Sequence, residues 1–329
     1  MTKVSVLVAV YNAAQYLHDC LDSLLNQTLK DIQVICIDDC STDNSLSILN
    51  EYAQKDSRVD VLRLDRNCGQ AHARNEGLKI ADGEFVCMLD ADDWFSADAL
   101  EKAVECFSEP EIDCVLFDVS MSWPDRSYMY QMPSFDVLTG VDAFRLSLDW
   151  QIHGLYMLRG DIHRENPYDE TCKLYSDDNT TRIHYLLSRK VGRCSGVYYY
   201  RQHSQSSTHA VSVRRFDYLK ANESMRRQLL QHNVSKDLVA IYENHRWLNL
   251  IGVYMFYHCH AKQLSVTDRQ YGLGEMKRVW TNIDRSVLNK KTTTKFGYRP
   301  MSRWCLFRIQ EWLYFTIRGI LKPQLTKEV

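Results

Sequence analysis

The stretch that decides the fold class is Val4-Ser5-Val6-Leu7-Val8-Ala9-Val10-Tyr11-Asn12. A short run that is almost wholly apolar and leads directly into a polar turn predicts a strand that is buried on both faces. The run lacks the small-residue cleavage site of a signal peptide, so we interpret it as part of the folded chain. Strands of this kind are typical of parallel sheets that helices cover on both sides.

Four further apolar runs follow within the first 120 residues, and helical patterns separate them. Leu17, Leu21 and Leu24 recur at helical spacing after the first run, and residues 41–43 supply capping side chains for the next helix. This β-α-β-α-β order predicts an α/β fold with a mostly parallel, Rossmann-like sheet flanked by helices. The four runs are residues 32–37, 59–64, 85–89 and 114–119.

The regular alternation ends after residue 120. From residue 216 onward the apolar spacing favours helices with few strand signals, so we place a boundary near residue 210. The expected organisation is an α/β domain of residues 1–210 and a mainly helical region of residues 211–329. Between residues 120 and 210 we expect an extended piece at 128–132, helices at 139–148 and 179–188, and a strand at 197–200.

The composition is that of a folded globular chain. Among 329 residues, 45% are hydrophobic and 25% are charged, which excludes disordered, collagen-like and low-complexity proteins. The eleven cysteines are scattered, odd in number and contain no C-x-x-C pair. Reduced thiols in a cytoplasmic protein fit this pattern better than a disulfide scaffold.

Carboxylates follow three of the predicted strands, and one of them is Asp65, directly after the run at 59–64. Asp38 and Asp39 end the second run, and Asp90, Asp92 and Asp93 come directly after the run at 85–89. Ligands of open α/β sheets bind beyond the carboxyl ends of the strands, where such carboxylates can share Mg²⁺ or Mn²⁺ with a phosphate. Helix capping is the competing interpretation of both segments.

Arg74 lies one turn inside a helix that the small residues of segment 68–77 open. An arginine at this position can contact a phosphate or brace the acidic loop. A surface ion pair is the alternative, and this segment alone leaves both open.

In their order and spacing, these segments closely resemble the family 2 glycosyltransferases. The resemblance implies a GT-A fold, a nucleotide-sugar donor, a divalent cation and inversion at the anomeric carbon. Ala9 stands where the family commonly has proline, and Cys40 stands where it commonly has glycine. The segments that carry the resemblance are 4–12, 21–28, 37–45, 73–77 and 89–93 and, more thinly, 175–178 and 198–208.

Five residues of this chain match positions that contact the nucleotide in the family. The resemblance implies that Asp39 binds the base, that Asp90 binds the ribose or a metal-bound water, and that Arg74 lies near the nucleotide. Tyr11 is expected against the base, and Ala9 is expected to contact the nucleotide through its backbone.

The remaining roles concern the metal and the reaction. The resemblance implies that Asp92 binds the metal and that Asp178 is the general base, with Asp177 as the competing candidate. His203 is a further candidate for a metal or phosphate contact, and Arg201 is an equal candidate for the diphosphate.

Other function classes were weighed against this one. A dinucleotide oxidoreductase would need G-x-G-x-x-G after the first strand, where residues 11–14 read Tyr-Asn-Ala-Ala, and no P-loop sequence occurs. A catalytically silent sugar-binding or partner-binding module on the same fold stays open. The intact carboxylates favour an enzyme over such a module.

The charge is unevenly distributed along the chain. Residues 262–329 hold fourteen Lys and Arg against five Asp and Glu, a net charge of +9, and residues 1–261 carry −11. From about Tyr298 onward we expect an amphipathic helix that either docks on the catalytic domain or lies on an anionic membrane. No recognised nucleic-acid-binding motif occurs, so no nucleic acid is expected. The apolar face of this helix is expected to hold Leu306, Ile309, Leu313, Ile317 and Ile320.

The resulting expectation is a metal-dependent hexosyltransferase or N-acetylhexosaminyltransferase. Its donor would be a nucleotide-diphosphate sugar, with a UDP-sugar favoured, and its cofactor Mn²⁺ or Mg²⁺. Its acceptor would be a hydroxyl of a saccharide or of a polyprenyl-linked saccharide, in surface polysaccharide synthesis. We expect a cytoplasmic protein with peripheral contact at the inner face of the membrane.

Overall fold

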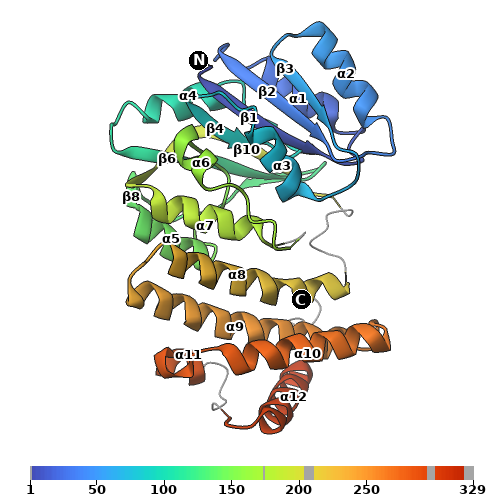
Figure 1. Ribbon diagram of the computed structural model, residues 1–329, viewed down its shortest axis with the longest axis vertical. Coiled ribbons are helices and arrows are strands. Elements are labelled where there is room, and N and C mark those ends of the chain that lie inside the picture. Colours follow the sequence, from blue (N-terminus) through green and yellow to red (C-terminus); the bar gives the residue numbers. More distant parts are fainter. Residues whose placement is uncertain (1, 173–174, 204–210, 295–300, 322–329) are drawn as a thin grey trace. The chain divides into compact units, whose positions relative to one another are not determined.

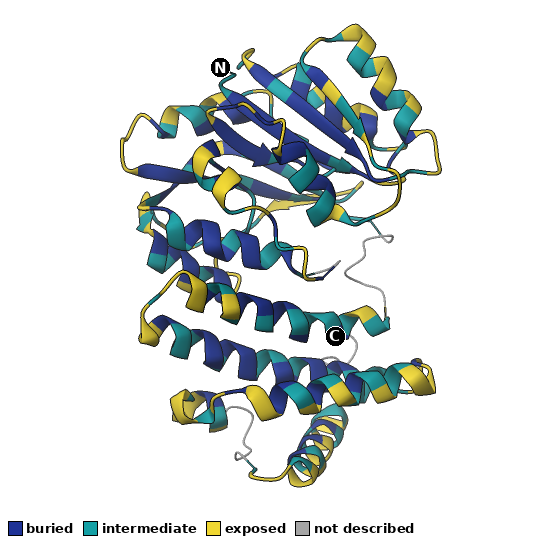
Figure 2. Ribbon diagram, in the orientation of Figure 1, coloured by how far each residue is buried: buried dark blue, intermediate teal, exposed yellow. Residues whose placement is uncertain are grey.

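A computed structural model describes residues 2–172, 175–203, 211–294 and 301–321 (Figure 1). The chain divides into two compact units, Met1–Ser206 and Ser207–Val329. The first is built on a sheet and the second is helical, as the sequence predicted. Each has its own buried core (Figure 2).

The first unit contains a ten-stranded mixed sheet in the order β3-β2-β1-β4-β9-β6-β10-β5, with β7 and β8 paired to β6 and β10. Strand β1 runs parallel to β2 and β4, β2 runs parallel to β3, and β6 runs parallel to β10. The strands are β1 (Val4–Val10), β2 (Ile32–Asp38), β3 (Val59–Arg63), β4 (Phe85–Met88), β5 (Trp94–Phe95), β6 (Ile112–Ser122), β7 (Ser127–Met129), β8 (Val137–Thr139), β9 (Tyr156–Arg159) and β10 (Lys190–Arg201).

Strand β1 is buried on both faces, because its alternate side chains enter two different cores. Val6 and Val8 belong to the core that includes Leu21 of α1, and Leu7 belongs to the core that includes Ala73 of α3. The helices of this unit are α1 (Leu17–Leu25), α2 (Ser45–Lys55), α3 (Gln70–Leu78), α4 (Ala99–Cys106), α5 (Gly140–Leu148), α6 (Gly160–Glu165) and α7 (Asp177–Leu187).

The predicted α/β fold class is therefore confirmed. The expected strands and helices are present, most of them within a few residues of their predicted bounds, but the strand expected at 197–200 is the end of β10, which begins at Lys190. The sequence pattern did not predict β5, β8, α6 or β9. Of these, β9 lies between β4 and β6 and is antiparallel to both. Its four residues give too short a pattern to identify. Their position in the centre of the sheet makes the sheet mostly, and not wholly, parallel.

The second unit is a group of helices around an aromatic core. Phe216, Trp247, Trp280 and Phe307 are among its buried members. None of the described helices combines the length and the hydropathy that a membrane-spanning helix needs. The elements are η2 (Val213–Phe216), α8 (Asp217–Gln231), α9 (Lys236–His260), α10 (Val266–Asn282), η3 (Arg285–Val287), α11 (Lys290–Thr294) and α12 (Trp304–Leu321).

Helix α12 confirms that the end of the chain holds an amphipathic helix, although its described part begins at Trp304 and Tyr298 lies outside the described residues. It packs through Phe307 and Phe315, which are buried against aromatic side chains of α9. The predicted apolar face points away from this core. Each of its five members, Leu306, Ile309, Leu313, Ile317 and Ile320, is exposed.

Candidate active site

The predicted nucleotide-binding carboxylates lie at one edge of the sheet. Asp39 follows β2 and Asp90 follows β4, and these parallel strands flank β1 on either side. The start of α3 joins the two positions, because the Gly69 amide donates to Asp39 and the Gln70 side chain donates to Asp90. Residues that are far apart in the sequence are thus brought to a common rim.

Asp39 is only 3% exposed, and both of its oxygens accept hydrogen bonds. The backbone amides of Cys68 and Gly69 donate to them at 2.7 and 2.8 Å. A carboxylate in front of a helix N-terminus is stabilised by the orphan amides and the helix dipole. Asp39 therefore holds the loop between β3 and α3, and each oxygen keeps a second lone pair toward a ligand.

Cys40 occupies a strained backbone position immediately after Asp39. Its φ of 62° lies in the left-handed region that favours glycine. Cys40, which stands where the family commonly has glycine, thus adopts the backbone conformation of a glycine at the cost of some strain. The Cys40 thiol makes a contact with the Asp65 carbonyl oxygen at 3.8 Å.

Arg74 and Asp90 form a buried ion pair. The Arg74 guanidinium is 1% exposed and donates from Nη2 to Asp90 Oδ1 at 2.6 Å. It lies over the ring of Tyr168, with 5.3 Å to the ring centroid. Burial raises the pKa of Asp90, and the nearby Arg74 opposes this rise. The surface ion pair considered in the sequence reading is excluded, because the arginine is inside the fold.

Arg74 keeps hydrogen-bonding capacity that the described residues do not use. Its Nε and Nη1 atoms are buried and have no hydrogen-bond partner among those residues. A buried guanidinium with free donors is a strong site for phosphate or carboxylate oxygens. The position of Arg74 thus fits a contact to an anionic ligand.

The two predicted metal ligands are in contact. His203 Nε2 lies 2.9 Å from Asp92 Oδ2, and the His203 ring stacks on Tyr16 with 5.2 Å between centroids. His203 Nδ1 is buried without a hydrogen-bond partner among the described residues. Of the segment 198–208 that carries part of the family resemblance, residues 204–208 lie outside the described residues.

The structure contains a partial donor set for a divalent cation. Within residues 2–172, 175–203, 211–294 and 301–321, no group of three or more His, Cys, Asp or Glu side chains is arranged to hold a metal ion. Mg²⁺ is usually held by one or two protein carboxylates together with substrate phosphates. The Asp92–His203 pair fits a cation of this kind, whose remaining ligands come from a diphosphate and water.

The neighbouring Asp93 has a structural role. It is fully buried and accepts hydrogen bonds from the Tyr198 hydroxyl and the Arg201 amide, both at 2.7 Å. The Arg201 side chain donates to the Asp92 carbonyl oxygen and to the Asp19 carboxylate. These bonds tie the acidic loop to β10 and engage the guanidinium that was considered for the diphosphate.

The acidic pair at the start of α7 separates into two environments. Asp177 lies close enough to Arg74 and Asp90 to influence the pKa of both. Asp178 lies 3.9 Å from Arg182 within the same helix. Burial raises the pKa of Asp178 to about 7, with Asp177 adding to the rise and Arg182 opposing it. A carboxylate with this pKa can exchange a proton near neutrality.

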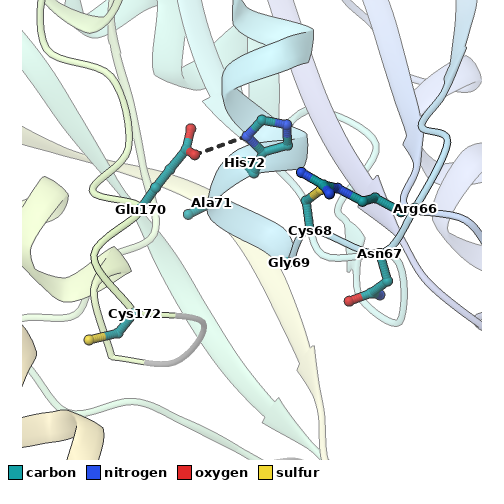
Figure 3. Close-up of a pocket in the computed structure, with 8 residues that line it drawn as sticks. All are labelled: Arg66, Asn67, Cys68, Gly69, Ala71, His72, Glu170 and Cys172. Carbon is teal, nitrogen blue, oxygen red and sulfur yellow. Dashed lines mark hydrogen bonds and ion pairs between the residues drawn. The ribbon is translucent and has the colours of Figure 1, made fainter.

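Ala9 and Tyr11 lie at the carboxyl end of β1, between the two carboxylate positions. Ala9 is partly buried and pairs with Ile37, and Tyr11 is 50% exposed. An open pocket of about 510 Å³ adjoins the loop that Asp39 holds. In Figure 3, His72 and Glu170 are joined by a hydrogen bond across it, with Arg66 and Cys68 nearby.

Two residues near Arg74 and Asp90 were not predicted. Gln70 donates to Asp90 at 2.8 Å, and Tyr168 supplies the ring beneath Arg74. Asn75 holds Tyr168 in place by bonding both its backbone amide and its carbonyl. Gln70 and Asn75 lie inside segment 68–77, which was singled out in the sequence, but Tyr168 is 93 positions from Asn75 and carries no local signal.

Comparison with known proteins agrees with this geometry. Residues 5–160 match the model of the family described as glycosyl transferase family 2. A poly(ribitol-phosphate) beta-glucosyltransferase of Bacillus spizizenii is 30% identical over 60% of this chain, which spans only 32% of that enzyme. The uncharacterised glycosyltransferase YibD of Escherichia coli K12 is 28% identical over 94% of this chain and 93% of its own length.

The fold is also shared with a solved structure. S. aureus TarS (residues 1–349), in complex with UDP-GlcNAc, superposes with a TM-score of 0.74 at 20% identity, over 97% of this chain and 92% of that one. At this identity the likeness concerns the fold. Over residues 5–160 the chain is thus similar to the family 2 glycosyltransferases, and it shares its fold with TarS.

Proposed function

We propose that this protein is an inverting glycosyltransferase of surface polysaccharide synthesis. It moves a sugar from a nucleotide-diphosphate sugar, with a UDP-sugar favoured, to a hydroxyl of a saccharide or polyprenyl-linked saccharide. The observation that carries the proposal is the rim formed by Asp39, the buried Arg74–Asp90 pair and the Asp92–His203 contact. The poly(ribitol-phosphate) glucosyltransferase among its relatives supports an acceptor of the cell-surface polymer class.

Each part of the rim has a role in the proposal. Asp39 and the exposed Tyr11 bind the base, with the Ala9 backbone beside them. Asp90, fixed by Arg74 and Gln70, binds the ribose, and the free donors of Arg74 face the phosphates. These groups are positioned before the substrate arrives, so little free energy is lost in ordering them on binding.

Asp178 is proposed as the general base. It takes the proton from the acceptor hydroxyl as the oxygen attacks the anomeric carbon on the side opposite the departing diphosphate. The pKa of about 7 allows it to be ionised at neutral pH and still to hold a proton once the hydroxyl has been deprotonated. Asp177, nearer to Arg74 and Asp90, is the alternative base.

Asp92 and His203 are proposed to hold Mg²⁺ or Mn²⁺. When bound, the cation stabilises the negative charge that develops on the leaving diphosphate. We further propose that residues 1–210 carry the transferase chemistry and that residues 211–329 serve another role. The protein would then work in the cytoplasm, peripherally at the inner face of the membrane.

A turnover assay separates an enzyme from a silent binding module. The full chain would be incubated with a panel of UDP-, GDP- and dTDP-sugars, with Mg²⁺, Mn²⁺ or EDTA, and release of the nucleoside diphosphate would be measured. We expect release from one donor class, dependent on the added cation, and increased by a saccharide acceptor. Tight donor binding in calorimetry without any release, with or without acceptor, would favour the silent module.

A further inference from the structure

Helix α12 presents an unusual outer surface to solvent. Every residue that it leaves exposed is apolar. Besides Cys305 and Leu321, near the two ends of the helix, these residues are Leu306, Ile309, Trp312, Leu313, Ile317 and Ile320. Its three charged residues, Arg308, Glu311 and Arg318, are buried or half-buried. We call the six residues from Leu306 to Ile320 in this set the outer face of α12.

This surface is not a general property of the second unit. Helix α10, of nearly the same length, exposes one large apolar side chain, Val266, together with Gln270, Lys277, Asn282 and smaller side chains. A contiguous apolar surface on a soluble domain marks a place where another body binds, because water does not favour its exposure. The other side of α12 is already in use, since Phe307 and Phe315 pack on α9.

We propose that the outer face of α12 lies in the surface of an anionic lipid bilayer. An amphipathic helix with an uncharged apolar face binds in the plane of the headgroup boundary, and basic residues beside it add attraction to anionic lipid. Residues 262–329 supply a net charge of +9, and Arg303 lies exposed just before the helix. Trp312 adds an aromatic ring of the kind enriched at membrane interfaces.

The charge distinguishes lipid from a second copy of the chain. Pairing two outer faces would bring two segments of net charge +9 together, and like charges across an interface oppose association. Residues 322–329 are a poor cover for the face, because Leu325 and Val329 are their only large apolar residues. An anionic bilayer would bury the apolar surface and would also attract the positive charge. The inference stands on α12 alone and does not depend on the donor or acceptor proposed above.

Co-sedimentation of the full chain with vesicles tests the proposal. We expect binding to vesicles of phosphatidylcholine mixed with phosphatidylglycerol and much weaker binding to phosphatidylcholine alone. Added salt should weaken the binding without abolishing it, because salt screens the charges and leaves the apolar contact in place. Failure of the intact protein to bind the anionic vesicles would overturn the proposal.

A pair of matched double variants locates the binding surface. Ile309→Glu with Leu313→Glu places two charges in the outer face, at side chains that are 56% and 47% exposed. Leu230→Glu with Val266→Glu makes the same change at side chains that are 48% and 62% exposed on other helices of this unit. We expect the first pair to reduce vesicle binding by about tenfold or more, since the apolar contact of the face is lost, and the second to leave it unchanged.

Thermal unfolding of both double variants checks that each still folds, which the exposure of all four side chains favours. Sedimentation velocity of the wild type tests the alternative that the outer face of α12 binds a second copy of the chain. Equal vesicle binding by both double variants would place the lipid surface elsewhere. A dimer that the Ile309/Leu313 variant dissociates, with unchanged vesicle binding, would make the face an interface between copies.

Discussion

Both units bury an apolar core and some charged side chains, but they differ in the groups that they place at the surface. In the first, the apolar strands are enclosed on both faces, and the site carboxylates sit at the rim with hydrogen-bond partners. In the second, Glu243 and Arg246 are paired inside at 1% exposure and Glu311 is fully buried, while the outer face of α12 is exposed. The candidate sites for polar ligands thus lie in the first unit, and an exposed apolar surface lies in the second.

The contrast follows from how strands and helices display side chains. A continuous apolar strand has no polar face, so the fold must cover both of its sides. A helix has several candidate faces, and its partners decide which one is buried. In α12 the two aromatic residues Phe307 and Phe315 fit between aromatic side chains of the core, and the aliphatic face is left outside.

The largest effect is expected at Asp178, and it tests whether the polar groups of the first unit carry the chemistry. Asp178→Asn should lower sugar transfer by about 10²–10⁴-fold, because the acceptor proton loses its base, while donor affinity stays nearly unchanged. In the wild type the rate should rise with pH through about 7, since the carboxyl must lose its proton to act and its pKa is raised to about 7. Initial transfer rates of wild type and variant, measured across pH, test both the loss of rate and its pH dependence.

Asp177→Asn is the matched control for that experiment, one residue away on the same helix. We expect it to retain most of the transfer activity. If Asp177→Asn abolishes transfer and Asp178→Asn does not, the base is the carboxylate nearer to Arg74 and Asp90.

The burial of Glu311 in the second unit is expected to make the free energy of unfolding depend on pH. Burial raises its pKa from an ordinary 4.5 to about 8, so the folded state favours the neutral acid. Below about pH 4.5, Glu311 is neutral in both states and its ionisation does not lower the free energy of unfolding. As the pH rises from 4.5 toward 8, ionisation stabilises Glu311 in the unfolded chain but not in the folded protein, so the free energy of unfolding falls. Each pKa unit corresponds to about 1.4 kcal/mol, so Glu311→Gln should be a few kcal/mol more stable than wild type in mildly alkaline buffer.

Urea unfolding of wild type and variant at acidic and alkaline pH measures this difference. Asp237→Asn, at an exposed position of α9, is the control and should leave the pH dependence unchanged over that range. A stability difference between wild type and Glu311→Gln that does not grow with pH would show that Glu311 finds a partner when ionised.

Asp92→Asn tests the metal site that we propose for the first unit. The neutral amide supplies less charge to a hard cation, so Mg²⁺- or Mn²⁺-dependent affinity for UDP should fall by about tenfold to a hundredfold. Titration calorimetry with and without EDTA measures the metal-dependent part. Asp82→Asn removes an exposed carboxylate elsewhere in the unit and should bind as the wild type does. An unchanged affinity in Asp92→Asn would remove Asp92 from the metal site.

The smallest expected effect is at Cys40. Its left-handed backbone at φ 62° penalises a side chain, and Cys40→Gly should raise the free energy of unfolding by about 0.5–1 kcal/mol after the entropy of the added glycine is subtracted. Cys40→Ala keeps the strain and removes the thiol, so it should not gain this stability. Chemical denaturation of all three proteins compares them, and equal gains in Ala and Gly would assign the effect to the thiol.

Much of the first unit could be predicted because its signals are local. The apolar runs gave β1 to β4 nearly residue by residue, and the carboxylates after β2 and β4 indicated a ligand site before any geometry was known. Strand β9 could not be predicted in this way. Its four residues form a strand because β4 and β6 offer it hydrogen-bonding edges, which is a property of the sheet and not of the segment.

The sequence by itself determined the α/β class, the family resemblance and the residue types at the rim, since these depend on short-range pattern and motif order. Only the tertiary structure decided that Arg74 is buried over Tyr168, that His203 meets Asp92, and which face of α12 is covered. Each of these depends on residues that are distant in the chain and become neighbours only when the sheet and the helices pack. Periodicity states that a helix has an apolar face, but the shape of the neighbouring core determines whether that face is buried or exposed.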